Sequence, residues 1–133
     1  MLNARIKSIG MIKSFRDLEV YNESMELASE IEHLARSFPE HEKYLLADQM
    51  RRASRSIPAL ISEGYAKRSS IKTFKKFLKD AVGESNEMQT HIELADNFGY
   101  IKKKDSGKEL IERYDKIGRQ LATLKDNWQN YKT

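Results

Sequence analysis

The sequence predicts an all-α fold, an antiparallel up-down-up-down four-helix bundle with a kinked second helix. Four segments carry apolar residues at steps of three and four, the spacing that places them on one face of a helix. Short polar links join these segments, and helices connected in this way pack most economically as antiparallel neighbours. Charged residues make up 33% of the chain and only two residues are proline, a composition that suits exposed helices better than sheets.

The length of the chain, 133 residues, predicts one domain with a single core. We assign the bundle to residues 15–133 and a flexible basic arm to residues 1–14, where the helical periodicity is weak. The chain has no cysteine, which excludes disulfides, thiolate metal sites and cysteine nucleophiles. Its longest apolar run, Ile57 to Ile61, is five residues, too short for a membrane span or a secretion signal. We therefore expect a cytoplasmic protein.

The first helix is expected to begin near Asp17 and to end at Phe38, because Pro39 cannot continue it. The outer face of this helix is acidic through Glu19, Glu23, Glu26, Glu30 and Glu32. The residues expected to face the core are Tyr21, Met25, Ala28, Ile31, Leu34 or Ala35, and Phe38.

The second helix is expected from about His41 to Lys67 and contains Pro58 near its middle. A proline there removes the hydrogen bond to the Ser54 carbonyl and costs about 3 kcal/mol. We nevertheless interpret the segment as one kinked helix, because small or apolar residues continue on one face through the proline: Leu46, Met50, Ala53, Ile57, Leu60 and Gly64. The alternative is a break at Ile57, since a residue before proline tends to leave helical geometry.

The third helix is expected to follow an N-cap at Ser69 or Ser70 and to end at Gly99 in a left-handed cap with apolar contacts. Its apolar face is predicted to hold Phe74, Phe77, Leu78, Ala81, Ser85, Met88, Ile92, Ala95 and Phe98. Asp105 or Ser106 is expected to cap the fourth helix, whose apolar residues follow a seven-residue repeat typical of bundles: Leu110, Tyr114, Ile117, Leu121, Leu124, Trp128 and Tyr131.

Three glycines fall inside predicted helices, where each costs about 1 kcal/mol relative to alanine. They are Gly64, Gly83 and Gly118. Close contact with a neighbouring helix would explain each of them, and simple tolerance at an exposed site would explain each equally well.

The net charge of +4 hides a strong segregation of charge along the chain. Residues 17–48 hold nine acidic and two basic side chains, whereas residues 51–79 hold nine basic and one acidic. Residues 80–99 then hold five acidic side chains and neither lysine nor arginine. Lysines thus crowd the N-terminal half of the third helix, where the helix dipole favours anions. This arrangement indicates a partner that compensates the charge.

A basic patch for nucleic acid is the partner site that we predict. Four lysines at offsets of 0, 3, 4 and 7 form one stripe, two cations in the preceding turn extend it, and Arg5, Lys7 and Lys13 of the arm lie at the same end of the predicted bundle. Tyr65 is the only nearby aromatic candidate for base stacking, so we expect salt-sensitive, sequence-independent contacts with backbone phosphates. The predicted binding residues are Lys67, Arg68, Lys72, Lys75, Lys76 and Lys79. Alternatively, the lysines form a solvated face or meet the acidic helix of a neighbouring subunit.

No motif in the sequence indicates catalysis, and we expect a protein that is not an enzyme and that holds no metal or cofactor. A dinuclear metal site in a bundle needs Glu-x-x-His on each of two helices, and only Glu30 with His33 fits that spacing. Gly-rich phosphate loops and nucleophile elbows are also missing. Two carboxylates near the apolar faces, Glu63 and Glu87, are expected to pair with Arg51, Arg52 or Arg55.

A series of short motifs runs in order through the chain. Its first half holds Phe15-Arg16-Asp17-Leu18-Glu19-Val20-Tyr21, Phe38-Pro39, Gln49-Met50-Arg51-Arg52-Ala53, Ser56-Ile57-Pro58 and Glu63-Gly64. Its second half holds Phe74 with Phe77-Leu78, Gly83-Glu84-Ser85, Glu87, and Leu94-Ala95 ahead of Gly99-Tyr100-Ile101. In these motifs, over about residues 15–130, the chain resembles the 23S ribosomal RNA intervening-sequence proteins, also called the four-helix bundle protein family.

The resemblance implies an antiparallel four-helix bundle that assembles as a homopentamer in bacteria. Some members of that family are encoded inside inserts of 23S ribosomal RNA genes, and the biochemical role of the family is poorly defined. More distantly, the chain is similar to the pentameric accessory proteins of diversity-generating retroelements, which are basic barrels that bind nucleic acid and a reverse transcriptase.

Two hypotheses follow. In the first, the protein is a non-catalytic oligomer that binds RNA or DNA through backbone phosphates. In the second, it is a structural or adaptor protein whose charged faces mediate self-assembly or bind a protein partner, with no nucleic-acid role. A kink at Pro58 would orient the arginines before it relative to the basic turn after it, so we expect Pro58→Ala to alter assembly. The residues assigned to structure or assembly are Arg51, Arg52, Arg55, Pro58, Glu63, Gly64 and Glu87.

Overall fold

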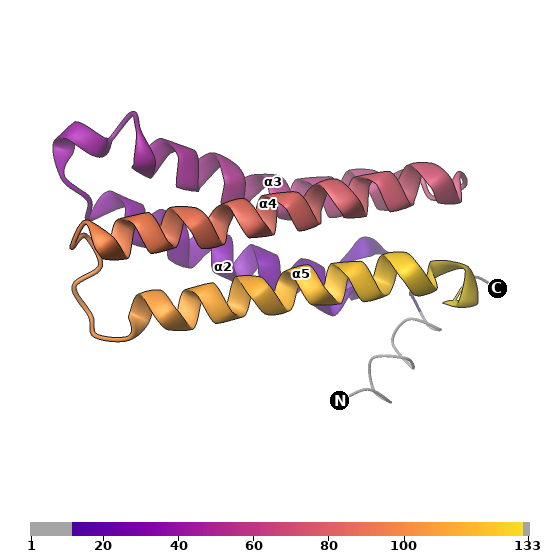
Figure 1. Cartoon of the computed structure of the whole chain (residues 1–133). Helices are drawn as coiled ribbons and strands as arrows, with labels where there is room; N and C mark the ends of the chain where they lie inside the picture. The colour runs from indigo at the N-terminus through magenta and orange to yellow at the C-terminus, as the bar shows by residue number, and fades with distance from the viewer. Residues whose placement is uncertain (1–11, 132–133) are drawn as a thin grey trace.

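The computed structural model describes residues 12–131, and over that range the chain forms helices and turns (Figure 1). Four long helices follow one another in the chain: α2 (Glu19–Arg36), α3 (Leu46–Ala66), α4 (Ile71–Asn97) and α5 (Ser106–Tyr131). Single 3-10 turns precede α2 and α3, namely η1 (Phe15–Asp17) and η2 (Glu40–Glu42). The predicted all-α class and the four helices are confirmed. Most of the predicted arm, residues 1–11, lies outside the described range.

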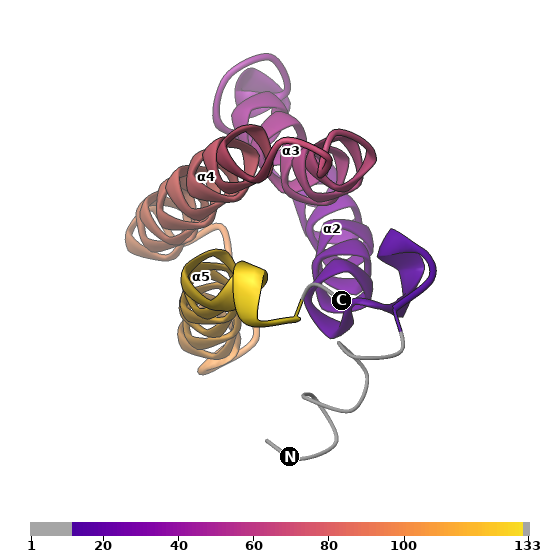
Figure 2. The ribbon, with the colours of Figure 1, turned by 90° about the vertical axis from the view of Figure 1, so that its right-hand side faces the viewer.

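The helices lie side by side in chain order, and the ribbon colour runs in opposite directions along consecutive helices (Figure 1). Viewed along their length, α2, α3, α4 and α5 follow one another around the core (Figure 2). Each consecutive pair is in extensive contact, whereas α2 and α5, which complete the circuit, touch far less. The link between α3 and α4 therefore lies at one end of the bundle, and the link between α4 and α5 lies at the other.

Helix α2 buries the second half of the face that we predicted, where Ile31, Ala35 and the following Phe38 lie in the core, but not its first half. Its buried residues are Val20, Ser24, Leu27, Ile31 and Ala35. Met25, which was expected in the core, is 46% exposed, and Tyr21 and Ala28 are only half-buried. The helix thus carries two apolar stripes one residue apart. Since the first half of the predicted stripe is the outer one, apolar surface remains uncovered on this side of the chain.

Helix α2 also begins later than expected. Ser14 accepts a hydrogen bond from the Arg16 N–H and, together with Asp17, forms a capping box around η1. Leu18 then takes an extended conformation, with φ −79° and ψ 121°, so α2 starts at Glu19. The predicted start near Asp17 therefore falls in η1, a separate turn that precedes α2.

Helix α3 is continuous through Pro58, which confirms one helix and argues against a break at Ile57. The bend at the proline stays a prediction. The helix begins at Leu46, later than the expected His41, because η2 and a turn with Leu45 at φ −115° and ψ −108° come first. A carboxylate oxygen of Glu42 accepts the free N–H of Leu46 at 3.2 Å and closes the helix start.

The caps of α4 agree with the sequence. The Ser70 side chain accepts the Thr73 N–H at 3.2 Å at the start of the helix. At its end Gly99 has φ +78°, and the Tyr100 N–H donates to the Ala95 carbonyl at 2.9 Å. This is the predicted left-handed cap, in which glycine avoids the steric cost of positive φ. Phe98, however, is 56% exposed and not part of the core.

The core of the bundle is formed most completely by α4 and α5, whose described apolar positions are buried as predicted, apart from Phe77 and Phe98. The buried residues of α5 are Leu110, Tyr114, Ile117, Leu121, Leu124 and Trp128. Phe74 and Trp128 pack edge to face across the two helices with ring centroids 4.7 Å apart. Such aromatic pairs stabilise a core by about 0.5–1.5 kcal/mol beyond the burial of their area.

The three helix glycines divide into close contacts and open space. A Cβ at Gly64 would lie 2.6 Å from Phe77 Cβ of α4, and one at Gly118 would lie 2.8 Å from Ser85 Oγ. At Gly83 a Cβ would meet nothing within 4 Å. Gly64 and Gly118 are therefore helix contact points, while Gly83 is a tolerated exposed glycine.

Candidate nucleic-acid interface

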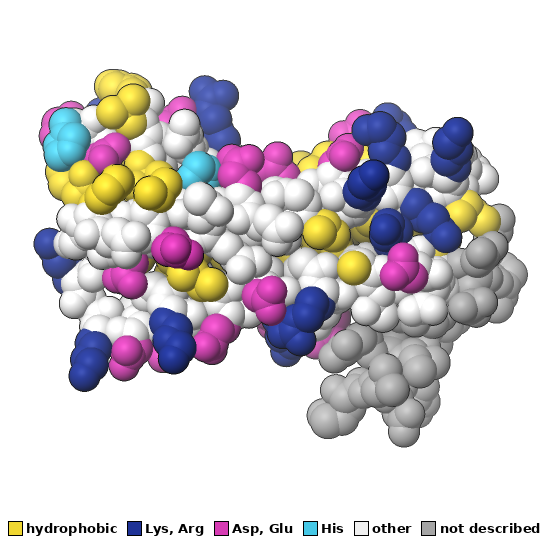
Figure 3. Space-filling model, in the orientation of Figure 1, with side chains coloured by type: hydrophobic (Ala, Val, Ile, Leu, Met, Phe, Trp, Pro, Cys, Tyr) yellow, Lys and Arg dark blue, Asp and Glu magenta, His cyan; other side chains and the backbone are white. Residues whose placement is uncertain are grey.

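A groove between α4 and α5 collects the predicted lysine stripe. Lys72, Lys76 and Lys79 are exposed, and Lys75 is half-buried. Lys125 joins them from α5, and the groove has a volume of about 720 Å³. Lysine and arginine side chains gather over this end of the bundle (Figure 3). We call this site the lysine groove and define it by Lys72, Lys75, Lys76, Lys79 and Lys125.

The lysine groove holds more cations than anions. Lys76 Nζ lies 3.0 Å from Asp80 Oδ2, and Lys125 Nζ lies 3.7 Å from Asp126 Oδ1. Within the described part of the chain, the other three lysines make no ion pair. Exposed pairs of this kind contribute at most about 1 kcal/mol. The groove therefore remains strongly positive.

The other two residues predicted for this patch, Lys67 and Arg68, make contacts within the α3–α4 turn. Lys67 Nζ lies 3.1 Å from Glu63 Oε2 and 5.0 Å from the ring centroid of Phe77. The Arg68 guanidinium donates to the Tyr65 carbonyl at 3.0 Å and covers the Tyr65 ring at 4.0 Å. Both residues are exposed, but neither lines the lysine groove; they stabilise the turn that precedes α4.

Lys125 was missed by the sequence-based prediction. The pattern of α5 alone shows only that this residue lies off the apolar face. Its place beside the α4 lysines follows from the register of the two helices, which brings Gly118 against Ser85 and Gly107 against Asp96. Continuing that antiparallel register puts residue 125 opposite residue 78, between the lysines of α4.

Two arginines of α3, Arg51 and Arg55, form a second cluster with Arg36 and Glu32 of α2. Glu32 accepts hydrogen bonds from Arg55 at 2.9 Å and from Arg36 and Arg51 at 3.1 and 3.2 Å. Partial burial would raise the pKa of Glu32, but the hydrogen bonds from Arg55 and Arg36 and the nearby charge of Arg51 outweigh it and lower this pKa. With three guanidinium groups around one carboxylate, the cluster keeps a positive surplus.

The predicted pairing of Glu63 and Glu87 with arginine is wrong. Glu63 pairs with Lys67, and Glu87 Oε2 lies 3.0 Å from His91 Nε2 one turn further along α4. The third arginine, Arg52, pairs with Asp48 at 2.9 Å. Glu63 follows Arg55, the nearest of the three predicted partners, by eight residues, or about 12 Å of helix, which is beyond the reach of an ion pair on the same helix.

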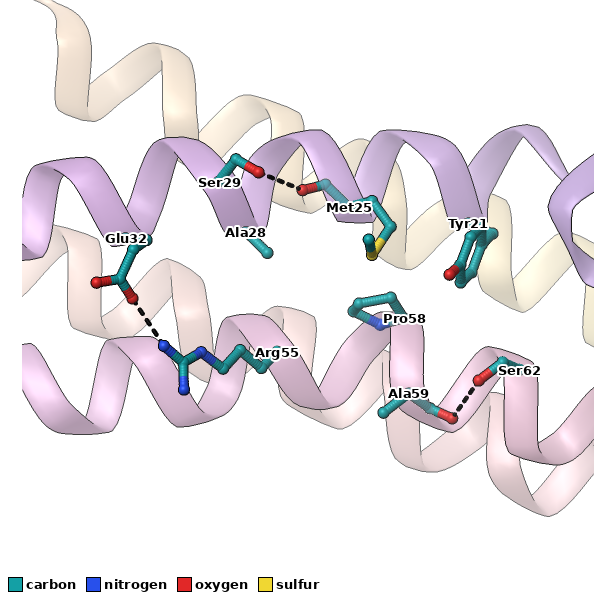
Figure 4. Close-up of a pocket in the computed structure, with 9 residues that line it drawn as sticks. All are labelled: Tyr21, Met25, Ala28, Ser29, Glu32, Arg55, Pro58, Ala59 and Ser62. Carbon is teal, nitrogen blue, oxygen red and sulfur yellow. Dashed lines mark hydrogen bonds and ion pairs between the residues drawn. The ribbon is translucent and has the colours of Figure 1, made fainter.

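A second groove lies between α2 and α3 and is largely apolar. It has a volume of about 540 Å³ and includes the outer stripe of α2. Met25 and Pro58 point toward one another across it, and the Glu32–Arg55 pair lies at one end (Figure 4). We call this site the α2–α3 groove and define its apolar part by Tyr21, Met25, Ala28, Pro58 and Ala59.

Comparison with known proteins assigns the chain to a family. The family model described as 23S rRNA-intervening sequence protein matches residues 16–123, most of the described bundle. The chain belongs to the 23S rRNA-intervening sequence protein family. The resemblance seen in the sequence motifs is thereby confirmed.

One solved structure supports the same assignment to the intervening-sequence family. It is described as a protein of unknown function from the S23 ribosomal protein family of Bacteroides thetaiotaomicron. The two chains are 25% identical, the match covers 80% of this chain and 95% of the other, and the TM-score is 0.72. No curated protein sequence matches this chain.

A polar cluster at the far end of this intervening-sequence protein links η2 to the turn after α4. The Tyr100 hydroxyl donates to Glu42 Oε2 at 2.8 Å, and His41 Nε2 lies 3.2 Å from the same hydroxyl. The hydrogen bond from Tyr100 and that from the Leu46 N–H lower the pKa of Glu42, and the bond to Glu42 raises the pKa of Tyr100. The cluster therefore closes the start of α3 and joins it to the α4–α5 turn.

The histidines and carboxylates of the described bundle do not gather into a metal site. Across residues 12–131, no three side chains of the types His, Cys, Asp and Glu are grouped closely enough to hold an ion. Glu30, part of the single Glu-x-x-His motif, pairs with Arg113 of α5 at 2.8 Å. Over the same range, every helix is too short or too polar to cross a membrane.

Proposed function

We propose that this member of the 23S rRNA-intervening sequence protein family is a non-catalytic protein that binds RNA or DNA through backbone phosphates at the lysine groove. The observation that carries the proposal is the set of five lysines around one open groove. Three of them lack an ionic partner in the described structure. Lysine is a point cation that suits phosphate oxygens, and such contacts carry no sequence information of their own.

The position of the lysines on α4 makes anion binding favourable. Lys72 lies in the first turn of the helix, where the dipole disfavours cations, and the pairs Lys72–Lys76 and Lys75–Lys79, at i and i+4, repel one another. A bound phosphate backbone relieves both effects. It also releases the counterions condensed on the nucleic acid, which drives association at low salt.

A salt titration of nucleic-acid affinity tests the proposed function. For five lysine–phosphate contacts with a duplex we expect log Kd to rise with log [salt] with a slope of about 4–5, since each contact contributes about 0.9. Fluorescence polarisation of a labelled oligonucleotide between 50 and 300 mM KCl would measure this slope. The absence of binding at the lowest salt, or a slope near zero, would contradict the proposal.

Self-assembly is a second candidate function, which two uncovered apolar surfaces favour. One is the α2–α3 groove, where Met25 is 46% exposed. The other lies at the end of the bundle that is remote from the lysine groove, where hydrophobic side chains are grouped on the surface (Figure 3). This apolar end consists of Tyr44, Leu45, Leu94 and Phe98.

Charges of opposite sign stand beside part of each apolar surface. Exposed Arg36 and Arg55 stand at the α2–α3 groove, while Glu93 and Asp96 stand beside Leu94 and Phe98 in an acidic helix half. We propose that the groove of one copy receives the apolar end of another. Contacts between two different surfaces of identical subunits form a closed ring when the rotation from one subunit to the next permits it. The pentamer expected from the resemblance requires contacts of this kind.

Met25→Lys is expected to lower the oligomer mass measured by light scattering, because it places a charge in the apolar α2–α3 groove. Pro58→Ala, which changes the opposite wall of the same groove, should shift the mass in the same direction but less. Thr123→Lys is the control, since it adds the same charge at an exposed site of α5. A wild-type mass equal to that of one 15.5 kDa chain would exclude self-assembly.

A further inference from the structure

Among the side chains that the structure describes, which in α5 end at Trp128, the aromatic rings near the lysine groove are buried or covered. Phe74 is fully buried, and Tyr65 and Trp128 are buried as well. The outer face of the Tyr65 ring is covered by the Arg68 guanidinium, and Lys67 Nζ lies over the Phe77 ring. The rings pack edge to face against one another, with centroids 6.3 Å apart for Tyr65 and Phe74.

Because these rings are buried, a single strand cannot gain affinity by stacking its bases on them. Proteins that prefer single-stranded nucleic acid stack its bases on exposed aromatic rings, which contributes about 1–3 kcal/mol per base. The described side chains that line the lysine groove include no aromatic ring, so they offer contacts to phosphate and sugar. Affinity then depends on how many phosphates the five cations can reach.

A duplex presents more charge to such a site than a single strand does. The exposed row from Lys72 to Lys79 spans seven residues, about 10 Å along a rigid helix. A double helix carries one negative charge per about 1.7 Å of its axis, so about six phosphate charges fall within that length. A straight row of cations on α4 therefore matches a stiff, densely charged rod.

From this geometry, and resting on the proposed function, we infer that the lysine groove prefers double-stranded nucleic acid to single strands. Contact with the duplex is confined to the end of the bundle where α4 begins. Beyond Lys79 the same helix carries only acidic charges, from Asp80 to Asp96, and these repel a phosphate backbone. The site therefore binds the side of a duplex over roughly one groove width.

The preference can be measured with three labelled probes of equal length: a 20-base-pair DNA duplex, a 20-base-pair RNA duplex, and the single strand dT20. Each phosphate contact contributes a salt slope of about 0.9 with a duplex and about 0.7 with a single strand. With five contacts, both duplexes should bind roughly sixfold more tightly than dT20 at 150 mM salt. A single strand with 2-aminopurine among its thymines should show no change in fluorescence on binding, because its bases remain unstacked on the protein.

The outcomes separate this inference from the proposed function. If dT20 binds as tightly as the duplexes, or if the 2-aminopurine fluorescence changes on binding, the duplex preference is overturned while nucleic-acid binding stands. If none of the three probes binds at 50 mM salt, both are overturned. Tighter binding of both duplexes with unchanged 2-aminopurine fluorescence supports the inference.

Discussion

Neutralising Lys72, Lys75, Lys76 and Lys79 together by substitution with glutamine should lower duplex affinity on the order of 10³-fold at 150 mM salt. Each lost phosphate contact lowers the salt slope by about 0.9, so the slope should fall by roughly 3 to 4. The remaining affinity would come from Lys125 and from the two cations of the α3–α4 turn. Fluorescence polarisation across a salt series measures both the affinity and the slope.

The quadruple variant should remain folded, so its effect on binding can be interpreted directly. Three of the four lysines are exposed, and their removal relieves repulsion along α4 by a few tenths of a kcal/mol per pair. A matched control replaces the exposed Lys103, Lys104, Lys108 and Lys116 with glutamine, which removes the same charge from the α4–α5 turn and α5. An equal loss of affinity in this control would mean that net charge, and not the lysine groove, governs binding.

The same two variants separate the first candidate function from a purely adaptor role. If the α4 lysines meet the acidic helix of another subunit, the quadruple variant should dissociate the oligomer and leave nucleic-acid affinity unaffected. If they bind phosphate, the affinity should fall while the mass measured by light scattering stays constant. One preparation of each variant is sufficient for both measurements.

The helices were predictable where one face alone is apolar. In α5 the seven-residue repeat leaves a single choice, and its described apolar positions are buried. In the first half of α2 the residues Val20 and Leu27 compete with Tyr21 and Met25 for a place in the core. The periodicity supports both stripes, so only the packing against α3 and α5 decides which one enters the core.

The site was predictable as a stripe but not as a groove. The offsets of the α4 lysines are fixed by helix geometry and needed no neighbour. Lys125 and the partners of the arginines depend on helix register, which a periodic pattern does not contain. Arg51 and Arg55 pair with Glu32 because α2 lies against that side of α3, 19 and 23 residues away in the chain.

Gly64→Ala is expected to destabilise the bundle by about 1–3 kcal/mol, although alanine is the better helix former by about 1 kcal/mol. The new Cβ would lie 2.6 Å from Phe77 Cβ and 3.1 Å from Phe74 Cδ1. Carbon atoms pack at about 3.5–4.0 Å. Because a Cβ is fixed to its backbone, Phe77 cannot turn away, and α3 and α4 must separate by about 1 Å.

Two further glycines in the same bundle provide controls of graded severity. Gly83→Ala meets no atom within 4 Å and should stabilise the protein by up to about 1 kcal/mol. Gly118→Ala meets Ser85 Oγ at 2.8 Å, an atom that rotation of the side chain can move, so its cost should lie between the other two. Urea unfolding at one fixed protein concentration gives all three free energies. If the Gly64→Ala variant were as stable as the Gly83→Ala variant, the contact between α3 and α4 at Phe77 would be looser than the structure shows.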